Sequence, residues 1–375
     1  MTDNRTRAHD ERAQSGLQAF AAGQTDRLEL IKQIESVRGS VVISYLTSIR
    51  PGFSSYVDDR DVRVIEAHIK KAKADGAQAI DLFLTTTGGM ATFPWDFLAM
   101  FREHLPKAKL GVLIPYWAYS AGTATALGAD EIVMGPSGVL GPVDSQMLRR
   151  RMELIVNSRL IHSFSELIEQ LGTKKSPKGI NIANLLAENS DPLILGALHR
   201  AAKEDDRYLD NAFGSRLKSL SKKDADRIRE FFLDGVNFHS QGIRRTEARA
   251  NGVSYLTNSE DTGAHDAMER LFEHYAAVMK LFHPVSGYEE LEFSGGFFDA
   301  YGQHSTQTPI AVVESRYDSN PAFSAYQQDR HWEVPPPLEG ESPAQPPENP
   351  QFRPERIRLN WATNSQLRAI SEGED

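Results

Sequence analysis

The sequence predicts an α/β fold built from crossover βαβ units, because apolar runs alternate with amphipathic segments along residues 80–146. The first apolar run, residues 80–84, precedes a glycine turn and apolar residues at helical spacing over 95–101. The second run, residues 110–114, precedes a serine turn and a helix of small residues. A third run over 132–134 completes the alternation.

The segments before this unit follow the same logic. Apolar residues at helical spacing over 28–37 predict a helix, which Thr25 and Asp26 are suited to cap. Residues 40–47 predict a strand, and turn residues over 48–61 predict a loop. An amphipathic helix is expected over 61–74, leading into the first apolar run.

Downstream, the patterns are mainly helical. Helices are expected over 147–171, 193–213 and 222–232, with a basic loop at 172–178 between the first two and a short closing helix beginning near 246. Beyond residue 281 the pattern changes, and only 310–313 indicates a short strand. The expected organisation is an N-terminal helical segment over 1–37, a main domain over 38–285, and an irregular C-terminal extension over 286–375 with a Pro-rich linker at 334–350.

Composition narrows the functional classes. A chain of 375 residues with 40% hydrophobic and 25% charged residues is typical of a globular protein with an ample core. The net charge of −9 disfavours nucleic acid and anionic membranes as partners. The absence of cysteine excludes disulfides, thiolate metal sites and a cysteine nucleophile. A charged N-terminus and the lack of any long apolar run predict no signal peptide and no membrane span, so we expect a cytoplasmic protein.

Cofactor motifs are also missing from the sequence. The eleven histidines are scattered without the spacing of a zinc site, and no Gly-rich loop is followed by a phosphate-binding lysine. We therefore expect no metal and no bound cofactor.

Two turns in the central unit carry chemistry. Gly88 and Gly89 end the first apolar run, and paired glycines at a strand end leave backbone N–H groups free to stabilise a developing anion. Ser120 stands between a strand and the first turn of a helix, where its hydroxyl is exposed. Each motif alone is commonly only a turn. Their combination at two strand ends favours a nucleophilic serine, with the N–H groups of Gly88 or Gly89 and of Ala121 as oxyanion donors.

At these residues the chain resembles a known family. The T-x-G-G turn, the Y-S-A-G-T turn and the segment A-L-G-A-D-E-I-V-M-G-x-x-x-x-L-G-P-x-D are similar to the serine dehydrogenase proteinase family, within the superfamily of Clp protease, signal peptide peptidase A and crotonase. The resemblance extends from Arg38 to near Leu256, about three fifths of the chain. It implies the Clp/crotonase-like ββα-superhelix, a serine peptidase activity and a homo-oligomer. It also implies that Tyr56 and Arg50 lie beside the cleft.

The general base stays open at this stage. A serine hydroxyl needs a base within hydrogen-bond reach, and the chain has Asp144 about where the Clp protease places its histidine. One possibility is that His239 draws the proton while Asp144 fixes its tautomer, an exchange of the two positions. A second is a lysine among the basic loop, Lys174, Lys175 or Lys178. The third is that no competent base exists.

The functional prediction is therefore a serine endopeptidase that cleaves peptides or proteins through an acyl-enzyme at Ser120, with a partner protein possible at the C-terminal extension. A crotonase-type acyl-CoA enzyme is the first rival, since that class uses the same fold and an oxyanion hole without a nucleophile. A catalytically inactive scaffold is the second, because the usual histidine is missing and the C-terminal extension is long.

Overall fold

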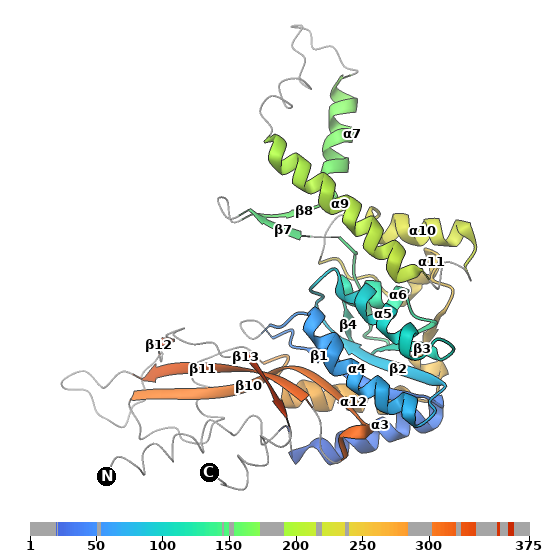
Figure 1. The fold of residues 1–375 in the computed structure, drawn as a ribbon. Coiled ribbons are helices and arrows are strands. Elements are labelled where there is room, and N and C mark those ends of the chain that lie inside the picture. Colours follow the sequence, from blue (N-terminus) through green and yellow to red (C-terminus); the bar gives the residue numbers. More distant parts are fainter. Residues whose placement is uncertain are drawn as a thin grey trace, which may run out of the picture.

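The computed structural model describes most of the chain between residues 20 and 363. The described ranges are 20, 22–50, 54–144, 146–149, 154–172, 191–214, 220–236, 240–283, 302–319, 324–334, 351–352 and 359–363. The long insertion of β7, β8, α7 and α9 rises from the main body, and the β10–β11 hairpin extends from its side (Figure 1).

A twisted β-sheet forms the centre of the molecule. Its strand order is β12-β11-β10-β1-β2-β3-β5-β9, with β13 also paired to β11. The strands from β1 to β9 in this order are parallel, and β10 pairs antiparallel with β1. The bounds are β1 Val41–Thr47, β2 Ala79–Thr85, β3 Lys109–Ile114, β5 Glu131–Met134, β9 Leu256–Asn258, β10 Gly302–Ser315, β11 Ser324–Val334, β12 Gln351–Phe352 and β13 Leu359–Thr363.

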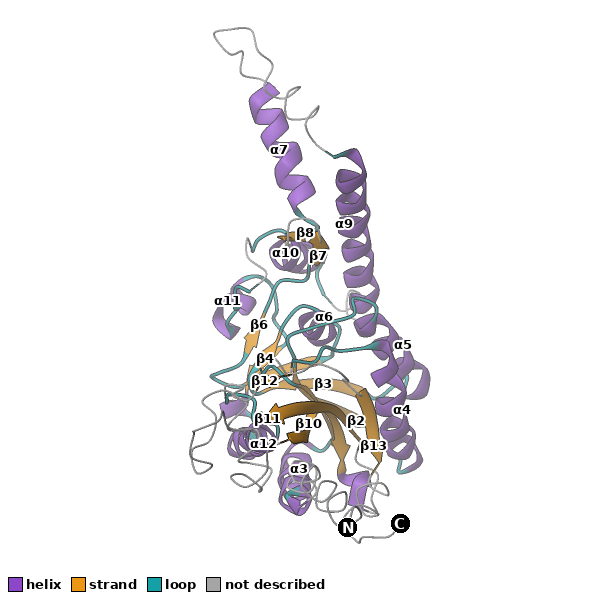
Figure 2. Ribbon diagram, turned by 90° about the vertical axis from the view of Figure 1, so that its left-hand side faces the viewer, coloured by secondary structure: helices purple, strands orange, loops and turns teal. Residues whose placement is uncertain are grey.

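Helices cover both faces of this sheet, so the body has three layers (Figure 2). Successive side chains of a strand point to opposite faces. Accordingly, Ile43 and Tyr45 pack with one cluster of buried residues, and Val42 and Leu46 with another. The first cluster includes residues of α4 (Asp59–Ala74), α5 (Phe93–His104) and α6 (Ala121–Leu127); the second includes residues of α3 (Gln24–Arg38) and α12 (His265–Val278).

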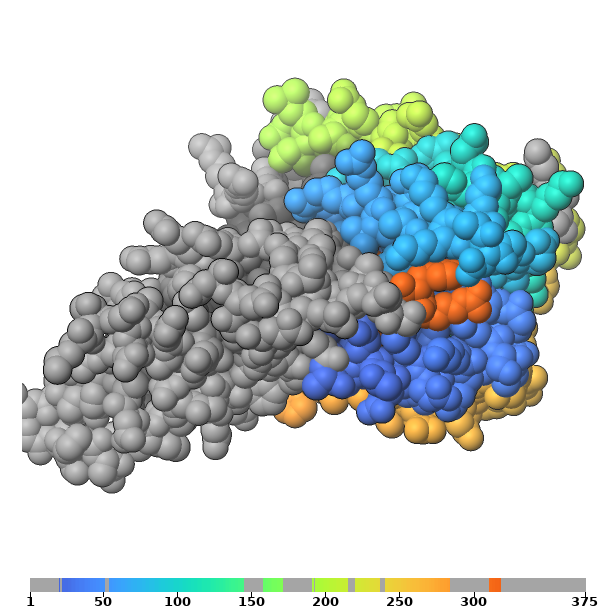
Figure 3. All heavy atoms as spheres, turned by 60° about the horizontal axis from the view of Figure 1, so that its bottom comes forward, coloured from blue at the N-terminus to red at the C-terminus, as the bar shows by residue number. Residues whose placement is uncertain are grey.

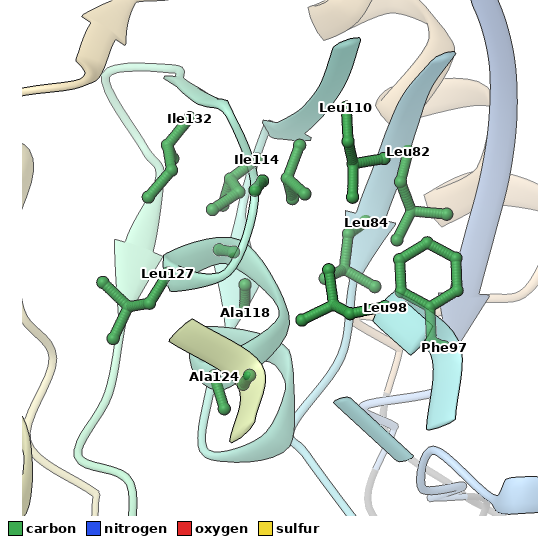
Figure 4. Packing of buried hydrophobic residues seen from close by; sticks show 14 of the residues in the cluster. Leu82, Leu84, Phe97, Leu98, Leu110, Ile114, Ala118, Ala124, Leu127 and Ile132 are labelled. Atoms are coloured by element: carbon green, nitrogen blue, oxygen red, sulfur yellow. The ribbon is translucent and has the colours of Figure 1, made fainter. Parts of the chain in front are cut away.

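The first cluster holds the site-bearing turns on a rigid base. Figure 4 shows Leu82 and Leu84 of β2 facing Phe97 and Leu98 of α5, with Ala124 of α6 lying nearby. All seven residues of α6 are buried, and their small side chains let this helix pack close to the sheet. The predicted α/β class with crossover units is confirmed by this arrangement.

Two regions differ from the sequence-based expectation. The prediction of one helix over 147–171 is wrong, because β7 (Gln146–Arg149) and β8 (Leu154–Asn157) form an antiparallel hairpin before α7 (Leu160–Gly172). Apolar runs too short to show a period do not distinguish helix from strand. The strand expected at 310–313 extends over the whole of β10. The remaining elements are the short strands β4 Trp117–Ala118 and β6 Val139–Leu140 and the helices α9 Pro192–Phe213, α10 Lys222–Leu233 and α11 Arg245–Ala250.

The C-terminal region contributes to the main body through β10. The end of β10 and the start of the turn η2 (Arg316–Ser319) lie between α3 and α4, visible as the orange surface in Figure 3. Inside, Glu314 accepts hydrogen bonds from the guanidinium of Arg27 at 2.8 and 3.0 Å and from the hydroxyl of Tyr275 at 2.6 Å. All three side chains are fully buried. The predicted boundary at 285 stays a prediction, but β10 and β1 share one sheet.

The start of α4 contains a buried carboxyl group. Asp58 caps the helix, and Asp61 completes a capping box with it. The carboxylate of Asp61 accepts hydrogen bonds from the hydroxyl of Tyr45 at 2.5 Å and from the backbone N–H of Asp58 at 3.2 Å. Burial is the largest influence and raises the pKa of Asp61 from 3.8 to about 6.

This raised pKa predicts a pH-dependent stability. Between pH 4 and 6 the folded protein holds a proton on Asp61 that the unfolded chain releases, so stability is lost as pH rises through 6. The loss from this group is about 3 kcal/mol in unfolding free energy. The amide of Asp61→Asn accepts hydrogen bonds but does not titrate, so its urea-unfolding free energy should lack this fall. The exposed-site variant Asp266→Asn should retain it, and equal pH slopes for both variants would contradict the assignment.

Candidate active site

Ser120 sits at a strained turn between β4 and α6. Its φ is 50° and its ψ is −113°, and Lys280 is the only other non-glycine residue with positive φ among the residues that the structure describes. Such a conformation costs about 1–3 kcal/mol and is concentrated at functional sites. The side chain is half-buried and lines a cleft.

The diglycine turn lies directly against Ser120. Gly88 has a φ of 103°, and a Cβ atom there would lie 2.7 Å from the Cβ of Ser120 and 3.3 Å from its Oγ. Gly89 has a φ of 153°, and its Cβ would lie 2.3 Å from the backbone oxygen of Val57. Both positions therefore require glycine, one for approach to the serine and one for approach to the neighbouring backbone.

Backbone hydrogen bonds determine which N–H groups of this turn face the cleft. The N–H of Gly88 donates to Thr86 Oγ1 at 3.0 Å. Val57 pairs with the residues on either side of Gly89: its N–H donates to the oxygen of Gly88, and its oxygen accepts from the N–H of Met90. In the described part of the chain, no hydrogen bond engages the N–H of Gly89 or that of Ala121. Both residues line the cleft of Ser120, as an oxyanion hole requires.

The cleft has a volume of about 330 Å³. Its walls are mostly small or apolar, and its titratable side chains among the described residues are two carboxyl groups and two phenols. The lining residues are Tyr56, Thr87, Gly89, Met90, Ala91, Pro94, Ser120, Ala121, Ala124, Val143, Asp144, Asp205 and Tyr208.

Asp144 lies in the same cleft and is only 4% exposed. The segment that carries it is fixed by two hydrogen bonds: Gly141 N–H donates to Thr123 Oγ1 at 2.9 Å, and Val143 N–H donates to the oxygen of Phe232 at 2.8 Å. The structure thus brings Asp144 and Ser120, separated in sequence, to one cavity. Whether Asp144 takes part in catalysis stays a prediction.

The candidate bases have no described position. His239 and the three lysines Lys174, Lys175 and Lys178 lie outside the described residues. Among the described residues that line the cleft, none is a histidine or a lysine. The identity of the base therefore stays a prediction.

Sequence reasoning missed two side chains of the cleft, Asp205 and Tyr208, which α9 contributes. Asp205 is buried and accepts a hydrogen bond from the hydroxyl of Ser158 at 2.6 Å. Helical spacing could have predicted its burial. Asp205 lies three positions after Ala202 and four before Leu209, on the same helix face as these two buried residues. Tyr56 lines the cleft as the resemblance implied.

Arg50, in contrast, is not among the cleft residues. It is fully buried, and its Nε donates to the backbone oxygen of His283 at 2.8 Å. This contact ties the loop after β1 to the residues that follow α12, so Arg50 stabilises the loop rather than facing a substrate.

Replacing Gly88 with alanine tests the contact between the two turns. The added methyl group would push the Ser120 side chain away and strain a φ of 103°, so we expect the rate of Ser120 modification by a fluorophosphonate to fall at least about 100-fold. Gly76→Ala is the matched control, because Gly76 has a φ of 74° but no atoms within 4 Å of the place that a Cβ would occupy. That variant should lose about 1 kcal/mol of stability and keep the labelling rate. Equal rates for both variants would show that the contact is irrelevant.

Neither a metal cluster nor a membrane-spanning helix is found in the described residues. No group of three or more His, Asp or Glu side chains in them is arranged to hold a metal ion. Likewise, none of their helices combines the length and apolarity needed to cross a membrane.

Comparisons with known proteins place this site in a family context. The family model described as ClpP-like SDH-type serine proteinase matches residues 18–162. An uncharacterized protein of Methanocaldococcus jannaschii is 36% identical over 127 residues, covering 32% of this chain and 42% of the relative. A second uncharacterized protein of that organism is 27% identical over 241 residues, covering 63% of this chain and 75% of the relative. The chain thus spans about two fifths of the length of the first relative.

Solved structures with similarity include a membrane-bound stomatin-specific protease, at 16% identity and a TM-score of 0.36, covering 58% of this chain and 79% of that one. Another is a structure named as a putative enoyl-CoA hydratase from Streptomyces coelicolor. Its identity is 16% and its TM-score 0.27, and the match covers 65% of this chain and 77% of that one.

The family match agrees with the sequence motifs that predicted it. The matched range contains the diglycine turn, Ser120 and Asp144, together with the strands β1 to β6 that position them. The predicted α/β fold class is confirmed, and the family model that matches is of the kind that the motifs predicted. Residues 18–162, about two fifths of the chain, are thus similar to the ClpP-like SDH-type serine proteinases.

Proposed function

We propose that the chain is a serine endopeptidase that hydrolyses peptide bonds through an acyl-enzyme on Ser120. The observation that carries the proposal is the strained Ser120 turn beside two N–H groups, those of Gly89 and Ala121, that no other group of the described residues engages. The similarity of residues 18–162 to a serine proteinase family supports the reaction class.

The reaction begins when Ser120 Oγ attacks the carbonyl carbon of the scissile peptide and its proton passes to the general base. The carbonyl oxygen becomes an oxyanion, which accepts hydrogen bonds from the N–H groups of Gly89 and Ala121. Collapse of this intermediate breaks the C–N bond, and the leaving amine takes the proton. Water then attacks the carbonyl carbon of the Ser120 ester while the base draws its proton. The ester C–O bond breaks, Ser120 Oγ takes that proton back from the base, and the acid product leaves.

The base is proposed to be His239, with the buried carboxylate of Asp144 fixing its tautomer. The position of Asp144 in the Ser120 cleft supports its part in this pair. A neutral lysine, Lys174, Lys175 or Lys178, is the alternative. The labelling rate of Ser120 in single variants of these four residues, followed across pH, distinguishes a histidine from a lysine.

The cleft also supports peptides as the substrate class. Its small and apolar lining, with Met90 and Tyr56 partly exposed at it, suits an extended chain with apolar side chains. Self-association of this chain and a cytoplasmic location stay predictions. Exposed leucines on the protruding helices α7 and α9, with Leu193 83% exposed, support an interface there.

A fluorophosphonate probe tests the proposal on the full chain. The probe forms a covalent bond with an activated serine hydroxyl, so we expect a single modified peptide containing Ser120 and no labelling after heat denaturation. An acyl-CoA enzyme that uses only the oxyanion hole would remain unlabelled, as would an inactive scaffold. Labelling at another serine would overturn the assignment of the nucleophile.

A further inference from the structure

Thr86 joins the two turns of the site through its backbone. It follows β2 directly and is fully buried. Its N–H donates to the oxygen of Trp117 at 2.8 Å, and its oxygen accepts from the N–H of Tyr119 at 3.1 Å. These two bonds hold the backbone on either side of Ala118, immediately before Ser120. The strand that ends at the diglycine turn is thereby kept in register with the segment that presents the nucleophile.

The hydroxyl of Thr86 holds the diglycine turn itself. Its Oγ1 accepts from the N–H of Gly88 at 3.0 Å and from the hydroxyl of Thr47 at 2.7 Å, and it donates to the oxygen of Gly88 at 3.3 Å. One donor and two acceptor sites are the full capacity of a hydroxyl. Both peptide groups flanking Gly88 are therefore held by one side chain.

The methyl group of Thr86 faces the serine helix. A Cβ atom at Gly122 would lie 2.6 Å from Thr86 Cγ2, so the methyl packs directly on the backbone of α6. Thr86 thus touches the diglycine turn with its hydroxyl and the serine helix with its methyl. Such close packing allows little relative movement of the two turns.

From these contacts we infer that Thr86 is the positioning residue that sets the oxyanion hole against Ser120, with Thr47 orienting its hydroxyl. By engaging the N–H of Gly88, Thr86 leaves that of Gly89 as the donor that faces the cleft. Thr86 itself does not touch the substrate. The inference rests on the proposed function and adds which residue determines the geometry of its oxyanion hole.

The test compares two replacements of Thr86. Thr86→Val keeps the shape but removes the hydroxyl, which releases the N–H of Gly88 and lets the turn rotate; Thr86→Ser keeps the hydroxyl. For phosphonylation of Ser120 by a fluorophosphonate, we expect the maximal rate to fall about 10- to 100-fold in Thr86→Val, with probe affinity little changed. The rate in Thr86→Ser should stay within about threefold of wild type.

A threonine outside this network serves as the matched control. Thr262 does not line the cleft, and its hydroxyl donates to the backbone oxygen of Ser259 at 2.6 Å. Thr262→Val should lower the unfolding temperature but keep the labelling rate. If Thr86→Val unfolds, Thr47→Val gives the second measurement, with an expected loss of about 3- to 10-fold.

The outcomes separate the two claims. Wild-type labelling of Ser120 together with full-rate labelling of Thr86→Val and Thr47→Val would overturn the positioning role and leave the proposed function intact. Rates that fall equally in Thr86→Val and Thr262→Val would also overturn it, because loss of stability alone would then explain both. A wild-type chain that is never labelled would overturn the proposed function, and the inference with it.

Discussion

Replacing Ser120 with alanine is expected to lower the rate constant for peptide hydrolysis by about 10⁵- to 10⁶-fold, the scale seen when a serine peptidase loses its nucleophile. The hydroxyl is the group that forms the acyl-enzyme, and no neighbouring side chain can replace it there. Fluorescein-labelled casein, cleaved by the full chain, provides the assay. The unfolding temperature should change little, because alanine retains the Cβ atom at the strained φ of 50°.

Ser137→Ala is the matched control for this change. Ser137 is exposed and does not line the cleft, so its replacement should leave casein hydrolysis unchanged. Hydrolysis that persists in Ser120→Ala at more than a few percent of wild type would mean that another group is the nucleophile. The oxyanion hole would then have to be reassigned together with it.

Replacing Glu314 with alanine is expected to lower the free energy of unfolding by about 3–5 kcal/mol, because it leaves the buried charge of Arg27 without its partner. The Arg27 guanidinium would lose the carboxylate that accepts two of its N–H groups, and the Tyr275 hydroxyl would lose its acceptor. Burial, followed by the charge of Glu314, raises the pKa of Tyr275 well above its usual value, so in the wild-type cluster the phenol is neutral and donates its hydrogen bond. Urea denaturation followed by fluorescence measures the loss.

Two comparisons make this prediction specific. The double variant Arg27→Met with Glu314→Leu removes both charges and should lie within about 1 kcal/mol of wild type or above it. Arg60→Ala removes a surface ion pair to Asp58, with the Arg60 side chain 74% exposed, and should change stability by less than about 1 kcal/mol. A loss in Glu314→Ala no larger than in Arg60→Ala would refute the importance of the buried cluster.

Local sequence patterns predicted the parts of the site that depend on local structure. The diglycine turn follows β2 and Ser120 comes six residues after β3, and these two parallel, mostly apolar strands end at the same edge of the sheet. The proximity of Gly88 to Ser120 follows from these two facts. The helices with caps and clear apolar spacing, such as α4 and α9, were predicted within two residues of their observed bounds.

Contacts between distant segments were beyond the sequence patterns. Asp205 lies on a charged stretch of α9 that resembles a solvated face, and only the fold of the insertion brings it to Ser120. The β7–β8 hairpin was missed because its strands have four residues each, too few to show a period of two. The pairing of β10 with β1 joins residues far apart in sequence, such as Tyr45 and Val313, which are 268 positions apart.

The pairing of β10 with β1 also has a consequence for the timing of synthesis. A ribosome produces Ser120 and both turns of the site long before it produces Glu314, and until then the nascent chain has Arg27 without its carboxylate and β1 without its outer neighbour. A chain of this kind gains its stable sheet only late in translation or after release. The nascent chain is therefore expected to have no peptidase activity toward proteins near the ribosome until β10 has paired with β1.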